Sequence, residues 1–120
     1  MSAKSYTVAD ARALIARVQP ILDDVIAIRA DLAELRADLA ADRPSRHGGL
    51  PEAKALEARV YALLEQVSKK GIEVKGWAPL LLDLPGNRKG VSVYWCWLEG
   101  DVELGWYHRR DCGFAGRRRI

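Results

Sequence analysis

The sequence predicts an α+β protein in which a long antiparallel helical hairpin packs on a small antiparallel sheet of three to four strands. Two observations indicate the helices: apolar residues recur every three or four positions from Ala11 to Leu39, and the same spacing returns after a turn rich in Pro and Gly. A third indicates the sheet, because the apolar period changes to two after Gly71. We expect one domain over residues 1–120.

The first helix is expected over residues 7–42, with a kink near Pro20. Thr7 and Asp10 have the spacing of an N-terminal capping box. The proline removes a backbone hydrogen bond, but the periodicity passes through it without a phase change, which favours one kinked, continuous helix. The apolar seam has the a/d spacing of a coiled coil and consists of Ala11, Leu14, Val18, Ile21, Val25, Ile28, Leu32, Leu35 and Leu39.

A second helix is expected over residues 51–70, after a turn containing Pro44 and Gly48-Gly49. It is shorter than the first helix, so it leaves the broad apolar half of that helix, Val8 to Val25, to be covered by something else. A second copy of the chain would cover it, and we therefore expect a homodimer. The alternative is a monomer whose sheet covers this half.

The strands are expected within residues 72–108. The apolar run Leu80 to Leu84 is followed by Pro85-Gly86-Asn87, which is typical of a turn, and Val91 to Leu98 is rich in β-branched and aromatic residues. A tight turn at Glu99-Gly100-Asp101 would pair this strand with Val102 to His108.

That turn sets a register in which Trp95 lies opposite Trp106, Trp97 opposite Leu104 and Val93 opposite His108. Three tryptophans and a histidine would then share one face of the sheet. Such a face is either an aromatic platform for a ligand or core packing against the helix, and core packing is favoured because each ring buries a large area.

Several motifs of the last third resemble a known family: Val93-Tyr94-Trp95-Cys96-Trp97, Gly100-Asp101, Trp106-Tyr107-His108 and Gly113-Phe114-Ala115-Gly116-Arg117. They are similar to the C-terminal signature of a small bacterial family catalogued as domain of unknown function two-two-zero-three. The resemblance extends over nearly the whole chain and implies a shared architecture without an activity. Family members commonly carry other residue types at the positions of Arg109, Arg118 and Arg119, so the basic tail is partly this chain's own.

Composition restricts the class of protein. The apolar content of 49% and charged content of 29% are those of a globular protein, and no apolar run is long enough for a membrane span. Cys96 and Cys112 are too few for a disulfide scaffold, and the N-terminus lacks a signal peptide, so we expect a cytoplasmic protein with reduced thiols and no membrane contact.

Asp83 interrupts an apolar run, so it either points to solvent from an edge strand or needs a partner. Arg88 or Arg117 could be that partner, and the group would form half of a polar site beside His108. A zinc site from His108, Asp111 and Cys112, with Cys96 approaching from a neighbouring strand, matches no strong ligand spacing. We therefore expect no metal and no cofactor.

The net charge of +3 is concentrated in the tail, residues 109–120. Its five arginines could grip phosphate, although a short basic tail is more often solvated, so only weak anion or nucleic-acid binding is expected. These residues are Arg109, Arg110, Arg117, Arg118 and Arg119.

Because no catalytic motif is present, we expect a non-enzymatic assembly or adaptor protein whose helical spine and C-terminal surface bind an unidentified protein partner. The alternatives are an anion or nucleic-acid binder that uses the tail, and a small enzyme or metal protein centred on His108. The residues expected to form the ligand or partner surface are Asp83, Arg88, Trp97, Trp106, His108 and Arg117.

Overall fold

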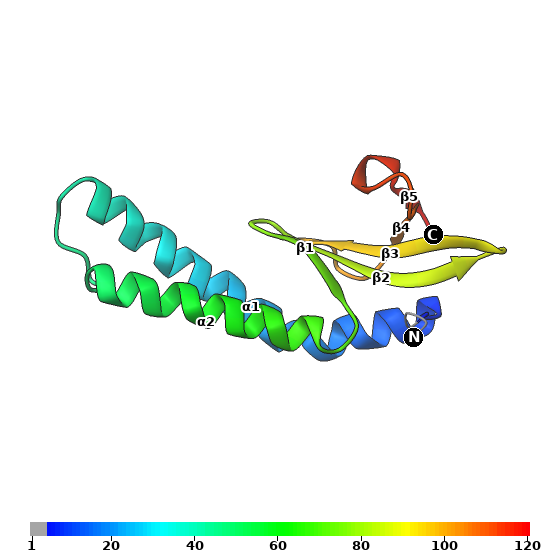
Figure 1. Ribbon diagram of the computed structural model, residues 1–120, viewed down its shortest axis with the longest axis horizontal. Helices are drawn as coiled ribbons and strands as arrows, with labels where there is room; N and C mark the ends of the chain where they lie inside the picture. Colours follow the sequence, from blue (N-terminus) through cyan, green and yellow to red (C-terminus); the bar gives the residue numbers. More distant parts are fainter. Residues whose placement is uncertain (1–4) are drawn as a thin grey trace. The chain divides into compact units, whose positions relative to one another are not determined.

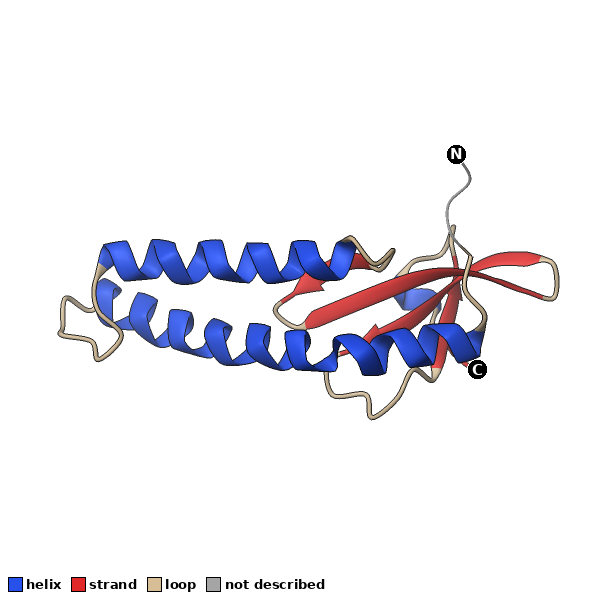
Figure 2. Ribbon diagram, turned by 90° about the horizontal axis from the view of Figure 1, so that it is seen from below, coloured by secondary structure: helices blue, strands red, loops and turns tan. Residues whose placement is uncertain are grey.

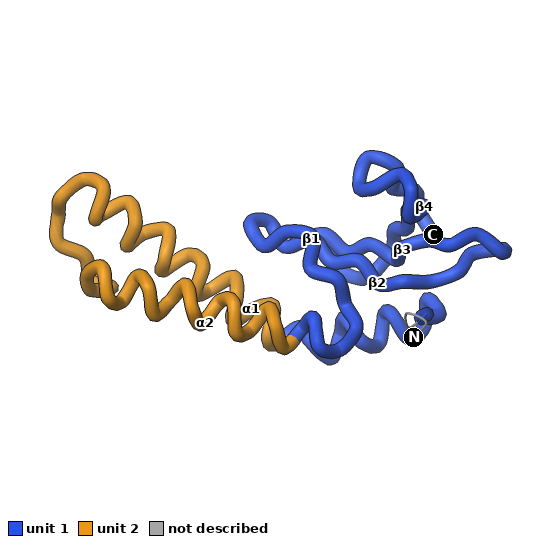
Figure 3. Tube along the Cα trace, viewed as in Figure 1, with its two compact units in different colours: residues 1–19, 67–120 blue, residues 20–66 orange. Residues whose placement is uncertain are grey.

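The structure, a computed structural model, describes residues 5–120 (Figure 1). Its helices and strands confirm the α+β class, but the sheet has five antiparallel strands, so the expectation of three to four was wrong. The chain forms two compact units, one of Met1–Gln19 with Val67–Ile120 and one of Pro20–Gln66 (Figure 3). The elements are α1 Val8–Ala40, α2 Leu50–Ser68, β1 Glu73–Trp77, β2 Leu80–Arg88, β3 Val91–Leu98, β4 Trp106–Arg109, the 3-10 helix η1 Phe114–Gly116 and β5 Arg118–Arg119.

In the unit Pro20–Gln66, the C-terminal part of α1 and most of α2 lie side by side and antiparallel (Figure 2). The seam predicted from the a/d spacing is buried in part: Leu32 and Leu35 pack against α2, where they contact Ala53 and Leu56, whereas Leu39 is exposed. Helix α1 is continuous through Pro20, as expected, and the kink stays a prediction.

In the other unit, the first turn of α1 is capped by Thr7, whose Oγ1 accepts a hydrogen bond from the Asp10 amide at 3.0 Å. Leu14, Ile15 and Val18 are buried within the single chain. The homodimer was expected because this apolar surface would need a cover, so the burial removes that reason, and the oligomeric state stays a prediction.

Neither helix, over the described residues, contains a segment apolar enough to cross a membrane.

The sheet is a meander in the order β1-β2-β3-β4-β5. Strand β2 continues through Pro85-Gly86-Asn87 to Arg88, so the turn expected there was placed wrongly. Proline is tolerated at this position because the pairing with β1 ends at Asp83, and the outer edge of β2 is met instead by Tyr6, whose amide donates to the Pro85 carbonyl at 2.7 Å. Strand β5 lies in the segment that was expected to be a tail.

The register between β3 and β4 differs by one residue from the expected one. Trp95 lies opposite Tyr107, and Cys96 lies opposite Trp106. The connection between these strands is not a tight turn but a loop over residues 99–105, in which Asp101 Oδ2 accepts a hydrogen bond from the Leu98 amide and Leu104 is buried. A one-residue change reverses the face of every later side chain.

The shift separates the aromatic set that was expected on one face. On what we call the Trp95 face, the aligned residues are Leu82, Leu84, Val93, Trp95, Trp97 and Tyr107. On the opposite face, the His108 face, they are Asp83, Tyr94, Cys96, Trp106 and His108. Trp95 anchors the first of these faces to the segment before α1, because its Nε1 donates to the Tyr6 carbonyl at 2.7 Å.

Candidate functional site

A pocket of about 310 Å³ lies at the end of the Trp95 face, where the β2–β3 turn, β4 and β5 meet. Strand pairing builds it: Val93 is aligned with Arg109, and Tyr107 with Arg118, so these side chains share one face. We call it the basic pocket, and its lining residues are Arg88, Lys89, Val91, Val93, Tyr107, Arg109, Cys112, Gly116 and Arg118.

The lining of the basic pocket holds cationic side chains and no carboxylate. Arg88 is fixed by Tyr107, because its Nη1 donates to the phenol oxygen at 2.7 Å and its guanidinium lies 4.3 Å from the ring centre. Arg109 is paired with Asp111, which lies outside the lining, and its hydrogen bonds lower the pKa of Asp111 to about 2. Within residues 5–120, no carboxylate lies within ion-pair distance of Lys89 or Arg118.

The five arginines expected to act together are divided between the two faces. Arg109 and Arg118 line the pocket. Arg117 and Arg119 instead lie over the Trp106 ring, with guanidinium carbons 4.7 and 5.1 Å from its centre. Arg110 lies over the ring of Tyr94 at 5.2 Å.

Sequence reasoning did not find Lys89 and Tyr107 as pocket residues. Lys89 has a positive φ of 52° beside Gly90 in the β2–β3 turn, and it lines the pocket. A turn placed at Lys89-Gly90 would have put Arg88 on the face of Val93, but only the observed β3–β4 register brings Tyr107 and Arg109 to that face.

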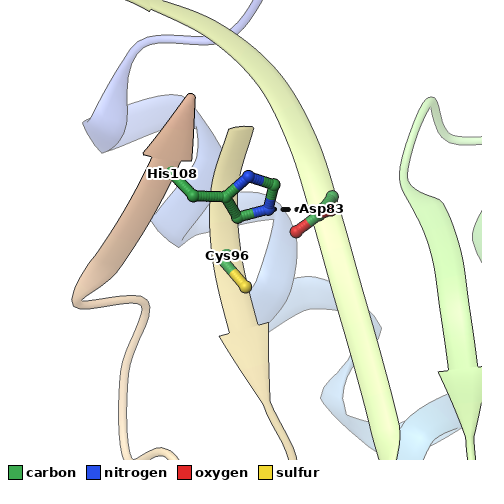
Figure 4. Close-up of side chains that lie close together, drawn as sticks. All are labelled: Asp83, Cys96 and His108. Carbon is green, nitrogen blue, oxygen red and sulfur yellow. Dashed lines mark hydrogen bonds and ion pairs between the residues drawn. The ribbon is translucent and has the colours of Figure 1, made fainter. Parts of the chain in front are cut away.

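A second group, the buried cluster, lies on the His108 face and consists of Asp83, Cys96 and His108 (Figure 4). One residue comes from each of β2, β3 and β4, because Asp83 is aligned with Cys96 and His108 with Tyr94, two positions before Cys96. All three side chains are buried, and His108 Nε2 lies 3.2 Å from Asp83 Oδ2.

The buried cluster has polar neighbours beyond its own three side chains. His108 Nδ1 lies 2.8 Å from the Arg109 carbonyl, and Lys75 Nζ lies 3.7 Å from Asp83 Oδ2. Asp83 Oδ1 makes no hydrogen bond to any of the described residues. Burial, and then the negative charge of Asp83, raise the pKa of the Cys96 thiol to about 12.

Asp83 does not have the partners expected from the sequence. Its partners are His108 and Lys75, whereas Arg88 binds Tyr107 and Arg117 pairs with Asp101 at 3.0 Å. His108 and Asp83 thus meet in the interior instead of in an open cleft.

The remaining residues expected at the site have other surroundings. Trp97 is buried and donates from Nε1 to the Asp101 carbonyl at 3.2 Å, which makes it part of the core. Trp106 is half-buried between arginines. Cys112 is exposed, so the thiol that joins His108 is that of Cys96.

Comparison with curated proteins and with solved structures found no match. A family model described as "Uncharacterized conserved protein (DUF2203)" matches residues 4–120. The match spans the helices, the sheet and both groups of residues described above, in agreement with the resemblance carried by the C-terminal motifs. The chain therefore belongs to this family of uncharacterised conserved proteins.

Proposed function

We propose that this protein is a non-enzymatic binding protein that holds a small polyanion, such as a phosphate-bearing molecule, in the basic pocket. The observation that carries the proposal is the lining of a 310 Å³ pocket by four cationic side chains and no carboxylate. These side chains are Arg88, Lys89, Arg109 and Arg118.

Like charges gathered around one cavity repel one another, so an anion that enters it gains favourable interactions with several cations together. Guanidinium groups suit phosphate or carboxylate because they donate two parallel hydrogen bonds, and Lys89 adds a mobile point charge. Arg88 is already oriented by Tyr107, which lowers the entropy lost when a ligand binds. The volume lies at the lower end of the range for small-molecule sites, which favours a small ligand.

Binding is proposed in preference to turnover because of the side chains that line the pocket. They include no imidazole and no carboxylate that could act as a general base toward a bound ligand.

Nucleic acid is a less suitable ligand for this surface. Arg117 and Arg119 lie against Trp106 and Arg110 lies against Tyr94, so the arginines do not form one continuous stripe along which a phosphate backbone would run. We expect nucleic-acid binding to be weak and strongly dependent on salt.

The adaptor function expected from the helical spine also has less support. The seam residues Leu32 and Leu35 already pack against Ala53 and Leu56 of the same chain. A partner on the hairpin would have to use other residues, so this function remains a prediction.

Calorimetric titration with inorganic pyrophosphate tests the proposal, and neighbouring residues of β5 offer a matched pair of variants. Arg118→Gln should weaken binding by about ten-fold, because it removes a charged hydrogen-bond donor from the pocket. Arg119→Gln removes the same charge from the opposite face and should change the affinity little. Equal losses of pyrophosphate affinity in both variants, or no binding by the wild-type protein, would contradict anion binding in the basic pocket.

A further inference from the structure

We propose that Asp83, Cys96 and His108 form a transition-metal site suited to Zn²⁺, separate from the basic pocket and on the opposite face of the sheet. The sequence led us to expect no metal, because the ligand spacing along the chain fits no known pattern. In the folded sheet, however, the strand register brings together one donor side chain from each of three adjacent strands.

The distances among the donors are close to those a metal would require. One ligand atom of each residue lies within 4.8 Å of the other two (Figure 4). Tetrahedral zinc with bonds of about 2.0–2.3 Å needs donors roughly 3.3–3.8 Å apart. His108 Nε2 and Asp83 Oδ2, at 3.2 Å, already have about this separation.

The hydrogen bond of His108 Nδ1 makes Nε2, which faces Asp83, the nitrogen that could ligate a metal. The Arg109 carbonyl 2.8 Å from Nδ1 can only accept, so Nδ1 carries a hydrogen. In a neutral imidazole Nε2 then presents a lone pair to the Asp83 carboxylate, which is unfavourable unless a proton or a metal cation lies between them. A backbone carbonyl that accepts from Nδ1 is also the usual support of a histidine that ligates a metal through Nε2.

A buried imidazolium–carboxylate pair would satisfy Nε2 and Oδ2 equally well, but it leaves the second oxygen of Asp83 unexplained. Asp83 is only 3% exposed, and its Oδ1 has no hydrogen-bond partner among the described residues. The Cys96 thiol lies fully buried beside it. A metal ion would use both as ligands, because a carboxylate oxygen and a thiolate are natural donors to it.

Charge balance also favours a divalent cation. Of the nearby cations, Lys75 is shared between Asp83 at 3.7 Å and Glu73 at 3.4 Å, and Arg117 pairs with Asp101. A thiolate, a carboxylate and a neutral imidazole carry two negative charges, which one Zn²⁺ neutralises. Three protein ligands leave one tetrahedral position for a non-protein ligand.

Titration of the metal-free protein with Co²⁺ tests this proposal, because a thiolate bound to Co²⁺ gives a charge-transfer absorption that oxygen and nitrogen ligands do not. We expect this band to saturate at one Co²⁺ per chain and to vanish when Zn²⁺ displaces the cobalt. Cys96→Ser should abolish it, and Cys112→Ser, at the exposed thiol, should leave it intact. His108→Ala should weaken binding at least about ten-fold.

The band also separates this site from the exposed group Asp31, Glu34 and His47, which offers no sulfur. Cobalt that binds without the band, or a band that persists in Cys96→Ser, would overturn the proposal. Should Cys96→Ser fail to fold, zinc X-ray absorption of the wild-type protein decides. One sulfur neighbour at about 2.3 Å supports the site, and a shell of oxygen and nitrogen alone refutes it.

Discussion

At the scale of single residues, position on a strand decides what an arginine does here. Arg117, Arg118 and Arg119 are consecutive, yet the first and last contact the Trp106 ring and only the middle one lines the basic pocket. Successive side chains of a strand point to opposite faces, so a count of charges in the tail cannot separate them. The residue types of an anion site were predictable from the sequence, and their grouping was not.

Asp111 limits anion binding in the basic pocket, because its carboxylate already accepts hydrogen bonds from the Arg109 guanidinium. Replacing it (Asp111→Asn) should release Arg109 and tighten pyrophosphate binding by a few-fold at most, since exposed ion pairs are weak. Lowering the pH from 7 to 5 should not reproduce this effect, because the pKa of about 2 keeps the carboxylate ionised throughout. Calorimetry of the variant at pH 7 checks the prediction, and unchanged or weaker affinity would contradict it.

At the scale of elements, local signals predicted the helices well. The a/d spacing identified seam residues such as Val18 and Leu35, both fully buried, and the cap at Thr7 is present. Both signals depend on neighbours within one or two turns of the same helix, which a sequence displays directly.

The ends of the strands were less predictable because they depend on distant partners. Pro85-Gly86-Asn87 has turn composition, but the pairing of Asn87 with Ser92 carries the strand through it. The loop before β4 depends on Leu104, whose carbonyl accepts a hydrogen bond from Arg12 of α1 at 2.8 Å. Because this hydrogen bond joins residues 92 positions apart, no local sequence pattern indicates it. The β3–β4 register was therefore predicted wrongly.

Gly86 offers a test of the packing of β2 against β3. A Cβ at this position would lie 2.2 Å from Trp95 Nε1, the atom that donates to the Tyr6 carbonyl. Gly86→Ala should therefore lower the free energy of unfolding by about 1–3 kcal/mol, as overpacking does. Gly105→Ala, whose Cβ would come no closer than 3.9 Å to another atom, is the matched control and should be nearly neutral in urea unfolding. Equal stability of the two variants would contradict the described packing.

At the scale of the whole molecule, the candidate chemistry is concentrated in the unit that contains the sheet. The basic pocket lies on one face of the sheet and the buried cluster on the other, so each can be altered without touching the residues of the other. The sequence predicted a surface that joins Arg88 to Asp83 and His108, and a separate basic tail. The register instead places Arg88 with Arg109 and Arg118 on one face of the sheet, and Asp83 with His108 on the other.

The central claim is that the arginines of the C-terminal segment bind anions as part of a formed pocket and not as a solvated tail. Backbone amide chemical shifts recorded during titration with pyrophosphate test it most directly. We predict shifts at Lys89, Gly90, Tyr107 and Arg118, with Asp83 and Leu32 unaffected. Shifts spread evenly over residues 109–120, with none in the β2–β3 turn, would contradict it.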